Sequence, residues 1–248
     1  MGRSVVVTGG ARGIGRCIAE HFHKDGCHVV IIDISREAGE SLCHAFEGME
    51  FFHGDIADKV NIDSFLETIE RPVDILINNA CVGRKGLLSG CSWDDFEYVQ
   101  RVGVIAPYYI THSLYSSGLL AQGASIVNIA STRGFQSQSD TESYSAAKGG
   151  ILALTHAMSV SLAGRARVNA ISPGWIDTTS TQQSVEDENQ HPASRIGRPE
   201  DIAQMVMFLC DNSRAGFITG ENIIIDGGMS KLMIYHKDRG WQYRHENN

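Results

Sequence analysis

Proline is scarce in this sequence, with 5 residues in 248, and no Pro/Ser-rich stretch, charge block or low-complexity tract divides the chain. Linkers between domains usually have such a composition, and no internal repeat is evident either. The length would allow two small domains or one α/β domain. The missing linker favours one domain that spans residues 1–248.

Long hydrophobic runs are absent as well. Residues 1–4 lead directly into Val5-Val6-Val7, which is too short for a signal peptide, and no segment reaches membrane-spanning length. The six cysteines include no Cys-x-x-Cys pair and no Cys/His cluster at zinc spacing. His21 and His23 would diverge on a helix. The sequence predicts a cytoplasmic protein with reduced thiols, no metal site and no membrane segment.

An excess of basic residues is also missing. Lys and Arg together number 21 against 29 Asp and Glu, a net charge of −8. Binding to nucleic-acid phosphates needs a basic surface, so nucleic acid is not the expected partner. The content of 42% hydrophobic and 20% charged residues is ordinary for a soluble globular protein.

Short β-branched runs alternate with helix-like patterns along most of the chain. The predicted strands are residues 4–8, 28–33, 50–53, 74–78, 125–130, 167–171 and 222–226. The predicted helices are residues 14–25, 36–46, 61–69, 93–119, 144–163 and 199–209. This alternation is typical of right-handed βαβ crossovers. We therefore expect an α/β fold with a parallel sheet covered on both faces, and ligands beyond the carboxyl ends of its strands.

A glycine-rich segment, Thr8-Gly9-Gly10-Ala11-Arg12-Gly13-Ile14-Gly15, follows the first predicted strand and opens the first predicted helix. Glycines let the backbone approach a pyrophosphate, whose charge is favoured by the helix N-terminus. Asp33 closes the second predicted strand, where a carboxylate can accept both ribose hydroxyls of an adenosine and repels a 2′-phosphate. An arginine such as Arg12 often pairs with a 2′-phosphate. With Asp33 at the ribose, we expect Arg12 in solvent or near the pyrophosphate, and NAD rather than NADP.

Tyr144 and Lys148 are four residues apart in Tyr-Ser-Ala-Ala-Lys, and Ser131 follows the fifth predicted strand. Residues i and i+4 share one helix face. A phenol has a reference pKa of about 10, so catalysis near pH 7 needs its anion stabilised by roughly 4 kcal/mol, which an ammonium about 4 Å away can supply. Taken alone, the pair also fits a solvated lysine beside a half-buried tyrosine. In its context it predicts a proton-transfer centre in which Ser131 holds a substrate oxygen.

Together these motifs resemble the short-chain dehydrogenase/reductase family, and the resemblance covers residues 3–229. The ordered signatures are Thr8 to Gly15, Asp55 after the third strand, Asn78-Asn79-Ala80, Ser131, Tyr144 with Lys148, Pro173-Gly174 followed by Thr178, and Asp226-Gly227-Gly228. The resemblance implies a single-domain, Rossmann-like, doubly wound sheet of seven parallel strands with helices on both faces. It also implies nicotinamide-dependent interconversion of alcohols and carbonyl compounds.

The resemblance implies a role for each matching residue. Tyr144 would be the acid/base and Ser131 the donor to the substrate oxygen, while Lys148 would tune the phenol and bind the nicotinamide ribose. The pyrophosphate would lie on the glycine turn, and the nicotinamide carboxamide on the Pro173-Gly174 turn. The adenosine would lie beside Asp55 and Asn79. The implied cofactor-binding residues are Gly9, Arg12, Gly13, Ile14, Gly15, Asp33, Asp55, Ile56, Asn79, Ala80, Tyr144, Lys148, Pro173, Gly174, Ile176 and Thr178.

Gly103 departs from the family pattern, which usually has an asparagine in the long helix before the serine strand. That asparagine is held to support a water that relays protons to the lysine. Glycine has no side chain for this role, and it weakens a helix interior by up to about 1 kcal/mol relative to alanine. Either a backbone carbonyl freed by a local kink holds the water, or turnover is reduced. Cys81, where a glycine usually follows Asn-Asn-Ala, is a milder change because cysteine is small and apolar.

The substrate is left open by the sequence. The lid expected over residues 178–198 is short and polar, and polar side chains also lie near the serine and after Asn-Asn-Ala: Arg84, Arg133, Gln136, Gln138 and Glu142. They favour a polyol, a sugar or a hydroxy acid, although solvated loops have the same composition. Trp175 and Phe135 fit a ring-shaped apolar substrate equally well.

The tail at residues 229–248 contains Leu232-Met233-Ile234-Tyr235, Trp241 and Tyr243, which are too apolar to leave in water. We expect it to pack on its own domain or on a neighbouring subunit. The usual homotetramer of the family agrees with the second arrangement, so we predict a homotetramer or homodimer.

The leading functional hypothesis is an NAD(H)-dependent oxidoreductase that interconverts a secondary alcohol and a ketone. A second hypothesis is an NADPH-dependent 3-oxoacyl-thioester reductase or a hydroxysteroid dehydrogenase of the same fold; Asp33 counts against a preference for NADPH. A third is a catalytically weak nucleotide-binding regulator, which only Gly103 supports.

Overall fold

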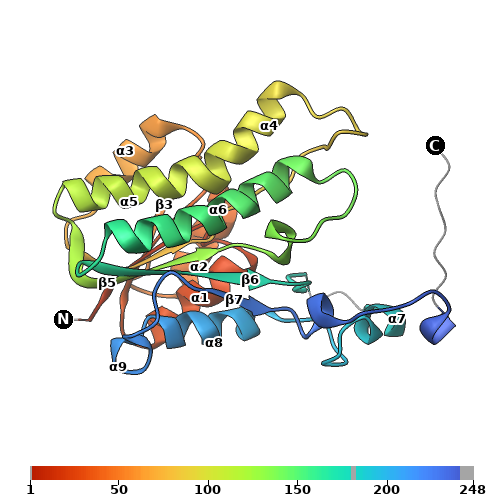
Figure 1. Ribbon diagram of the computed structural model, residues 1–248. Helices are drawn as coiled ribbons and strands as arrows, with labels where there is room; N and C mark the ends of the chain where they lie inside the picture. The colour runs from red at the N-terminus through yellow and green to blue at the C-terminus, as the bar shows by residue number, and fades with distance from the viewer. Residues whose placement is uncertain (1, 180–182, 241–248) are drawn as a thin grey trace.

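A computed structural model describes residues 2–179 and 183–240 of the chain. Its centre is a sheet of seven parallel strands in the order β3-β2-β1-β4-β5-β6-β7 (Figure 1). The strands are β1 (Ser4–Thr8), β2 (His28–Asp33), β3 (Glu50–His53), β4 (Val73–Asn78), β5 (Leu120–Ile129), β6 (Ala166–Pro173) and β7 (Asn222–Ile225). The predicted Rossmann-like, doubly wound sheet is confirmed. Its strand order reverses between β1 and β4, and open α/β sheets bind ligands at such a point.

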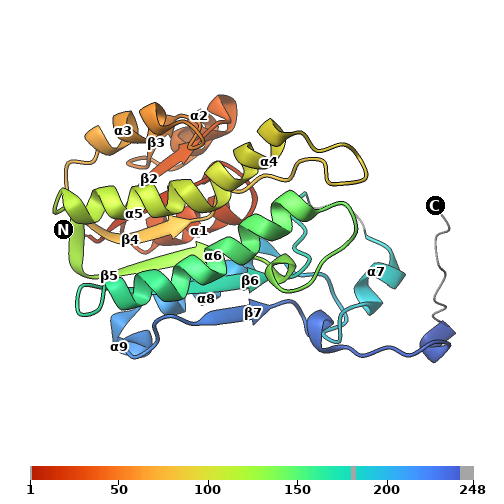
Figure 2. The ribbon, with the colours of Figure 1, turned by 45° about the horizontal axis from the view of Figure 1, so that its top comes forward.

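Helices cover both faces of the sheet (Figures 1 and 2). They are α1 (Gly13–Lys24), α2 (Arg36–Ala45), α3 (Lys59–Glu67), α4 (Trp93–Gln100), α5 (Ala106–Ser116), α6 (Glu142–Ser161), α7 (Val185–Asn189), α8 (Pro199–Leu209) and α9 (Asn212–Ala215). Helices α1, α2 and α8 pack on one face, and α3, α5 and α6 pack on the other. In β1, Val5 and Val7 face the first group and Val6 faces the second. Burial on both faces is why the strands are continuously apolar.

The helix predicted for residues 93–119 is confirmed as a continuous helical run from Trp93 to Ser116, with a π-helical segment inside it. The chain forms α4, then the π-helical segment η1 (Arg101–Ile105), then α5, and β5 already begins at Leu120. Ser92 caps α4 by accepting a hydrogen bond from Asp95 N, and Pro107 lies in the first turn of α5. Other short segments were not predicted: α7 within the expected lid, and the 3₁₀ turns η2 (Thr132–Gly134), η3 (Met229–Lys231) and η4 (Asp238–Gly240).

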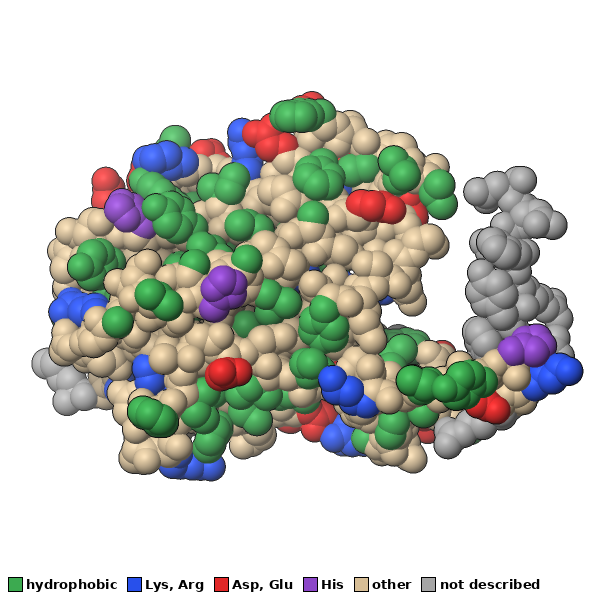
Figure 3. Space-filling model, viewed as in Figure 1, with side chains coloured by type: hydrophobic (Ala, Val, Ile, Leu, Met, Phe, Trp, Pro, Cys, Tyr) green, Lys and Arg blue, Asp and Glu red, His purple; other side chains and the backbone are tan. Residues whose placement is uncertain are grey.

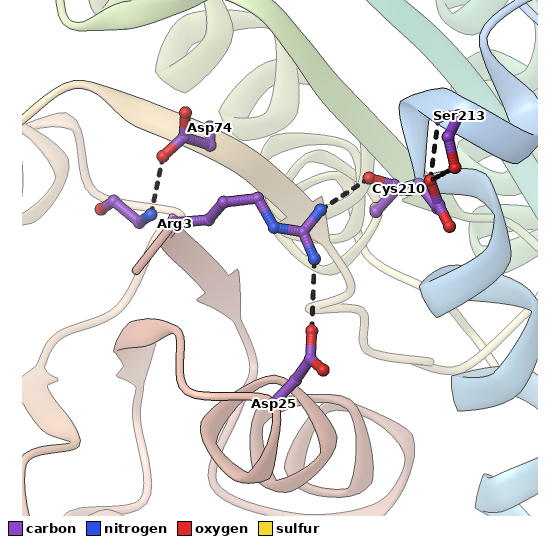
Figure 4. A network of polar contacts seen from close by, with 7 residues as sticks. Arg3, Asp25, Asp74, Cys210 and Ser213 are labelled. Atoms are coloured by element: carbon purple, nitrogen blue, oxygen red, sulfur yellow. Dashed lines mark hydrogen bonds and ion pairs between the residues drawn. The ribbon is translucent and has the colours of Figure 1, made fainter. Parts of the chain in front are cut away.

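A polar network joins elements at the amino ends of the strands (Figure 4). The Arg3 guanidinium donates to Cys210 O at 2.8 Å, beyond the end of α8, and to Asp25 Oδ2 at 3.4 Å, beyond the end of α1. Ser4 N, at the start of β1, donates to Asp74 Oδ2 at 2.8 Å. These contacts anchor β1 at the end of the sheet opposite to the glycine turn.

Candidate active site

The glycine turn is built so tightly that side chains do not fit. Gly9 and Gly13 have positive φ angles of 64° and 55°, which favour glycine. A Cβ added to Gly15 would lie 2.2 Å from Gly9 O. The Asn79 amide, just after β4, donates to Gly9 O at 2.8 Å and to Thr8 O at 3.1 Å. The turn is therefore held against the end of β4.

Asp33 lies at the end of β2 beside this turn. Its Oδ2 accepts from Ala11 N at 3.0 Å and its Oδ1 from Ser35 N at 2.9 Å. Each carboxylate oxygen can accept about two hydrogen bonds, so the group keeps capacity for a ligand hydroxyl. The Arg12 guanidinium donates to Ser35 Oγ at 3.3 Å. Arg12 is exposed, which agrees with the expectation that it lies in solvent. Its side chain lies beside the loop that follows Asp33.

A cleft of about 1030 Å³ runs along the carboxyl ends of the strands. All but one of the predicted cofactor-binding residues line it, and the exception, Gly15, is buried in the turn. The residues on the wall are Gly9, Arg12, Gly13, Ile14, Asp33, Asp55, Ile56, Asn79, Ala80, Tyr144, Lys148, Pro173, Gly174, Ile176 and Thr178. Segments far apart in the sequence thus form one continuous surface; for example, a Cβ on Gly13 would lie 3.2 Å from Thr178 Cγ2.

Tyr98 also lines this cleft and was missed by the sequence analysis. Its hydroxyl donates to Asp55 Oδ2 at 3.0 Å, and the Arg84 guanidinium lies 4.9 Å from its ring centroid. Burial, followed by the hydrogen bond to Asp55, raises the pKa of Tyr98. One available signal was its spacing of four residues before Val102, another cleft residue, which places both on one helix face.

Tyr144 and Lys148 project from the same side of α6. Lys148 is buried, with 4% of its surface exposed, and its Nζ lies 5.5 Å from the Tyr144 ring centroid. Nζ donates to Ile129 O, at the end of β5, at 2.7 Å. An ammonium has three donors, so two hydrogens stay available for other partners. The structure thus brings a buried positive charge next to the phenol ring.

Ser131 follows β5 and lines the same cleft. Its Oγ accepts a hydrogen bond from Arg133 N at 3.1 Å. This bond uses an acceptor site of the hydroxyl and leaves the hydroxyl hydrogen for donation to a ligand oxygen. Ser131, Tyr144 and Lys148 are therefore gathered as the sequence analysis expected, although their catalytic roles stay a proposal.

Gly103 lies buried in η1, where the chain packs against α6. A Cβ at this position would lie 2.8 Å from the Cβ of Ala147, the residue before Lys148. The contact gives a physical reason for glycine, because the crossing of the two helices has no room for a side chain. A π-helical turn also disturbs the regular hydrogen-bond ladder, which is the kind of kink expected from the sequence.

A second cleft, of about 1210 Å³, adjoins the first and shares Ser131 and Tyr144 with it. Of the residues considered for the substrate, the ones on its wall are Arg84, Arg133, Gln136, Gln138 and Trp175. Glu142 is not on the wall, because its Oε2 accepts from Leu87 N at 2.8 Å. Phe135 is not on the wall either, and 46% of its surface is exposed.

The expected lid is described only in part, since Ser180, Thr181 and Gln182 lie outside the described residues. Within residues 2–179 and 183–240, no helix has the length and apolar character needed to cross a membrane. In the same part of the chain, no three His, Cys, Asp or Glu side chains are grouped so as to hold a metal ion.

Comparison with known proteins identifies the family. A family model described as "Enoyl-(Acyl carrier protein) reductase" matches residues 9–230. The chain is 42% identical over 253 residues to an uncharacterized oxidoreductase of Thermotoga maritima, covering 95% of this chain and 99% of that protein. The chain belongs to the short-chain dehydrogenase/reductase family. It is thus an oxidoreductase, and its family uses NAD(P).

Solved structures of the short-chain dehydrogenase/reductase family have the same fold. An apo SCOR enzyme from Clostridium thermocellum is 44% identical, with a TM-score of 0.91 and coverage of 99% of this chain and 100% of that one. A 3-ketoacyl-(acyl-carrier-protein) reductase from Brucella melitensis, complexed with NADH, is 28% identical, with a TM-score of 0.82 and coverage of 92% and 98%.

Proposed function

We propose that this oxidoreductase is NAD(H)-dependent and interconverts a secondary alcohol and a ketone. The observation that carries the proposal is that Ser131, Tyr144 and Lys148 line the same cleft as the glycine turn and Asp33. A proton-transfer group and a dinucleotide-binding surface in one cleft suit hydride transfer coupled to proton transfer.

The cleft fits a dinucleotide, and we propose NAD over NADP. Positions 9 and 15 have no space for a Cβ, as expected of a backbone cradle for a pyrophosphate. The Asp33 carboxylate favours the two hydroxyls of an adenosine ribose over a 2′-phosphate. Arg12, bonded to Ser35 Oγ, is a nearby feature that favours a 2′-phosphate. The NADH complex of the Brucella melitensis reductase supports NAD as a ligand of this fold.

In the proposed reaction a nicotinamide, when bound, supplies or accepts the hydride. The Ser131 hydroxyl donates a hydrogen bond to the substrate oxygen and fixes its position. The Tyr144 phenol gives its proton to that oxygen during reduction, and the phenolate takes a proton from it during oxidation. Lys148 places a positive charge beside the ring, where negative charge develops.

Substitution of Tyr144 by phenylalanine tests this proposal. NADH formation would be measured over a panel of polyols, sugars, hydroxy acids and hydroxysteroids. We expect Tyr144→Phe to lower turnover by about 10²- to 10⁴-fold, because the phenylalanine ring has no proton to exchange. The thermal midpoint serves as the control for folding and should stay unchanged, and the variant should still bind NAD.

Two outcomes would oppose the proposal. Equal turnover by both proteins would remove Tyr144 from the chemistry. Tight NAD binding without turnover by either protein would favour the nucleotide-binding regulator, the hypothesis from another functional class.

A 3-oxoacyl-thioester reductase is the second candidate within the family. The similarity to the Brucella melitensis reductase supports it. Reduction of a 3-oxoacyl thioester with a marked preference for NADPH would rank this function first. The polar wall of the second cleft, with Arg133, Gln136 and Gln138, supports a polyol, sugar or hydroxy acid instead.

We also propose that the protein forms a homotetramer or homodimer. Apolar side chains are exposed on η1, α5 and α6, including Ile105 (54%), Tyr108 (51%) and Val160 (76%), and hydrophobic side chains are spread over the face formed by α5 and α6 (Figure 3). In the tail, Met233 and Tyr235 are exposed.

Two other residues of the predicted tail, Trp241 and Tyr243, lie outside the described residues. A mass measurement on a chain truncated after Met229 tests whether the tail joins subunits, and an unchanged oligomer would refute that role. A cytoplasmic location stays a prediction from the sequence.

A further inference from the structure

We propose that the second cleft binds a carboxylate of the substrate through Arg133, so that the substrate is a hydroxy acid and the product the corresponding oxo acid. This inference rests on the proposed function, since Ser131 and Tyr144 lie on the same wall. In the oxidation, the carbinol C–H bond breaks as hydride leaves for the nicotinamide of NAD. The hydroxyl proton passes to Tyr144, and a C=O bond forms.

Arg133 is held firmly beside the reacting groups. It lies in η2, directly after Ser131, and its backbone N donates to Ser131 Oγ. The next residue, Gly134, packs on α6 so closely that an added Cβ would lie 2.9 Å from Lys148 O. The backbone of Arg133, a half-buried residue, is therefore fixed relative to the hydroxyl that would hold the substrate oxygen.

Among residues 2–179 and 183–240, no acidic side chain forms an ion pair with Arg133. Its Nη2 donates to Gln138 Oε1, which is a neutral acceptor. Within the described part of the chain, no carboxylate lies within ion-pair distance of Arg133 or of Arg84. Elsewhere, by contrast, arginines such as Arg101 and Arg195 pair with acids at 2.7 Å. A guanidinium with spare donors is a fitting partner for a carboxylate, which it can bind through two parallel hydrogen bonds.

The other residues on the wall of the second cleft agree with an anionic ligand. Asp187 is the one acidic side chain among the described residues on the wall. Its Oδ2 already accepts from Ser184 N and Ser184 Oγ, which form the N-terminal cap of α7. Trp175 and Met229 supply apolar surface on the same wall. The cleft thus combines positive charge with room for a short carbon chain.

Binding measurements on matched ligands test the assignment without relying on turnover. The full-length protein, saturated with NADH so that no alcohol can be oxidised, would be titrated with 2-hydroxybutyrate and 3-hydroxybutyrate and with the primary amide of each acid. Acid and amide have nearly the same shape and differ in charge. We expect at least one acid to bind about 10-fold or more tightly than its amide, since charged hydrogen bonds are among the strong ones.

Arg133→Gln should reduce that preference to about 2-fold or less and leave the amide affinity unchanged. Arg133→Lys, which keeps the charge and loses the planar fork, should retain part of it. Arg214→Gln is the matched control: its guanidinium stacks at 5.0 Å on Phe208, outside both clefts, so the preference should persist.

The inference is overturned if acid and amide bind the unmodified protein equally or not at all, or if the preference survives Arg133→Gln. Selective binding of an acid without NADH formation would oppose the proposed function and retain the carboxylate site. Oxidation of amides and neutral alcohols as readily as acids would retain the function and reject the carboxylate site.

Discussion

Arg3 and Arg167 lie near the amino ends of the strands, whereas Arg84 and Arg133 lie beyond the carboxyl ends. The Arg167 guanidinium donates to Ser125 Oγ at 2.6 Å, to Leu209 O at 2.7 Å and to Asn212 Oδ1 at 2.6 Å. Arg3 is likewise bonded to a carbonyl and a carboxylate. At the other end, Arg84 stacks on a ring and Arg133 bonds to an amide oxygen. Residues of one type thus join elements at one end of the sheet and face open clefts at the other.

Because of this difference, we expect the arginines at the amino ends of the strands to contribute to stability and those at the carboxyl ends to contribute to ligand binding. Where donors are used up by acceptors of the chain itself, removing the side chain leaves buried carbonyls without partners. Where the donors of an arginine are unused and face a cleft, removing its side chain should change the stability of the fold little, but a ligand would lose a hydrogen-bond partner. Substitutions at the two ends should therefore affect different measurements.

The largest effect on stability is expected from Arg167→Met, at the amino ends of the strands. The change removes several hydrogen bonds at once and should lower the free energy of unfolding by about 3 kcal/mol. Urea denaturation measures this loss, and Arg214→Met, which removes a surface stacking contact, should cost under about 1 kcal/mol. The turnover of the folded protein should not change. Similar losses for the two variants would contradict the comparison.

A smaller loss of stability is expected from Gly103→Ala, near the carboxyl ends of the strands. The new methyl group would approach Ala147 Cβ and force η1 away from α6, at a cost of about 1–3 kcal/mol. Gly149→Ala in α6 is the control, because the nearest atom to its new Cβ would lie 3.6 Å away. That variant should be unchanged or gain up to about 1 kcal/mol from helix propensity. Thermal unfolding of both variants measures the difference, and a stabilised Gly103→Ala would refute the packing argument.

The smallest effect is expected from Asp33→Asn, which should change cofactor use more than stability. Asparagine keeps one acceptor oxygen and loses the charge that favours ribose hydroxyls, so KM for NAD should rise by about 10-fold and the preference over NADP should fall. Initial rates with both cofactors measure this. Asp25→Asn, in the exposed ion pair with Arg3, should leave both KM values unchanged. A change of equal size in the two variants would remove Asp33 from the ribose site.

Much of this arrangement could be predicted because it depends on local patterns. The bounds of β1, β2, β3 and α8 agree with the ranges expected from β-branched runs and from Pro199. The glycine turn and the Tyr144–Lys148 pair likewise depend on short spacings. The site followed because parallel strands bring their carboxyl ends to one edge.

The features that were missed depend on contacts between distant segments. The π-helical segment inside the helix predicted at residues 93–119 lies where Gly103 meets Ala147. The place of Tyr98 in the cleft depends on its bond to Asp55, and the exclusion of Glu142 depends on its bond to the Leu87 amide. A short pattern such as the Tyr98–Val102 spacing indicates a shared helix face, and it does not identify the distant partner.

The hydrogen bond from Arg133 N to Ser131 Oγ has a stereochemical consequence. Because one acceptor site of the serine is occupied, its hydroxyl hydrogen has few directions left, and each is set relative to the side chain of Arg133. A substrate held at its oxygen, at its carboxylate and at the carbon that exchanges hydride has three distinct points of attachment. Mirror-image molecules cannot satisfy all three in the same way, so, on the proposed function, we expect the turn after β5 to select one hand of a chiral alcohol.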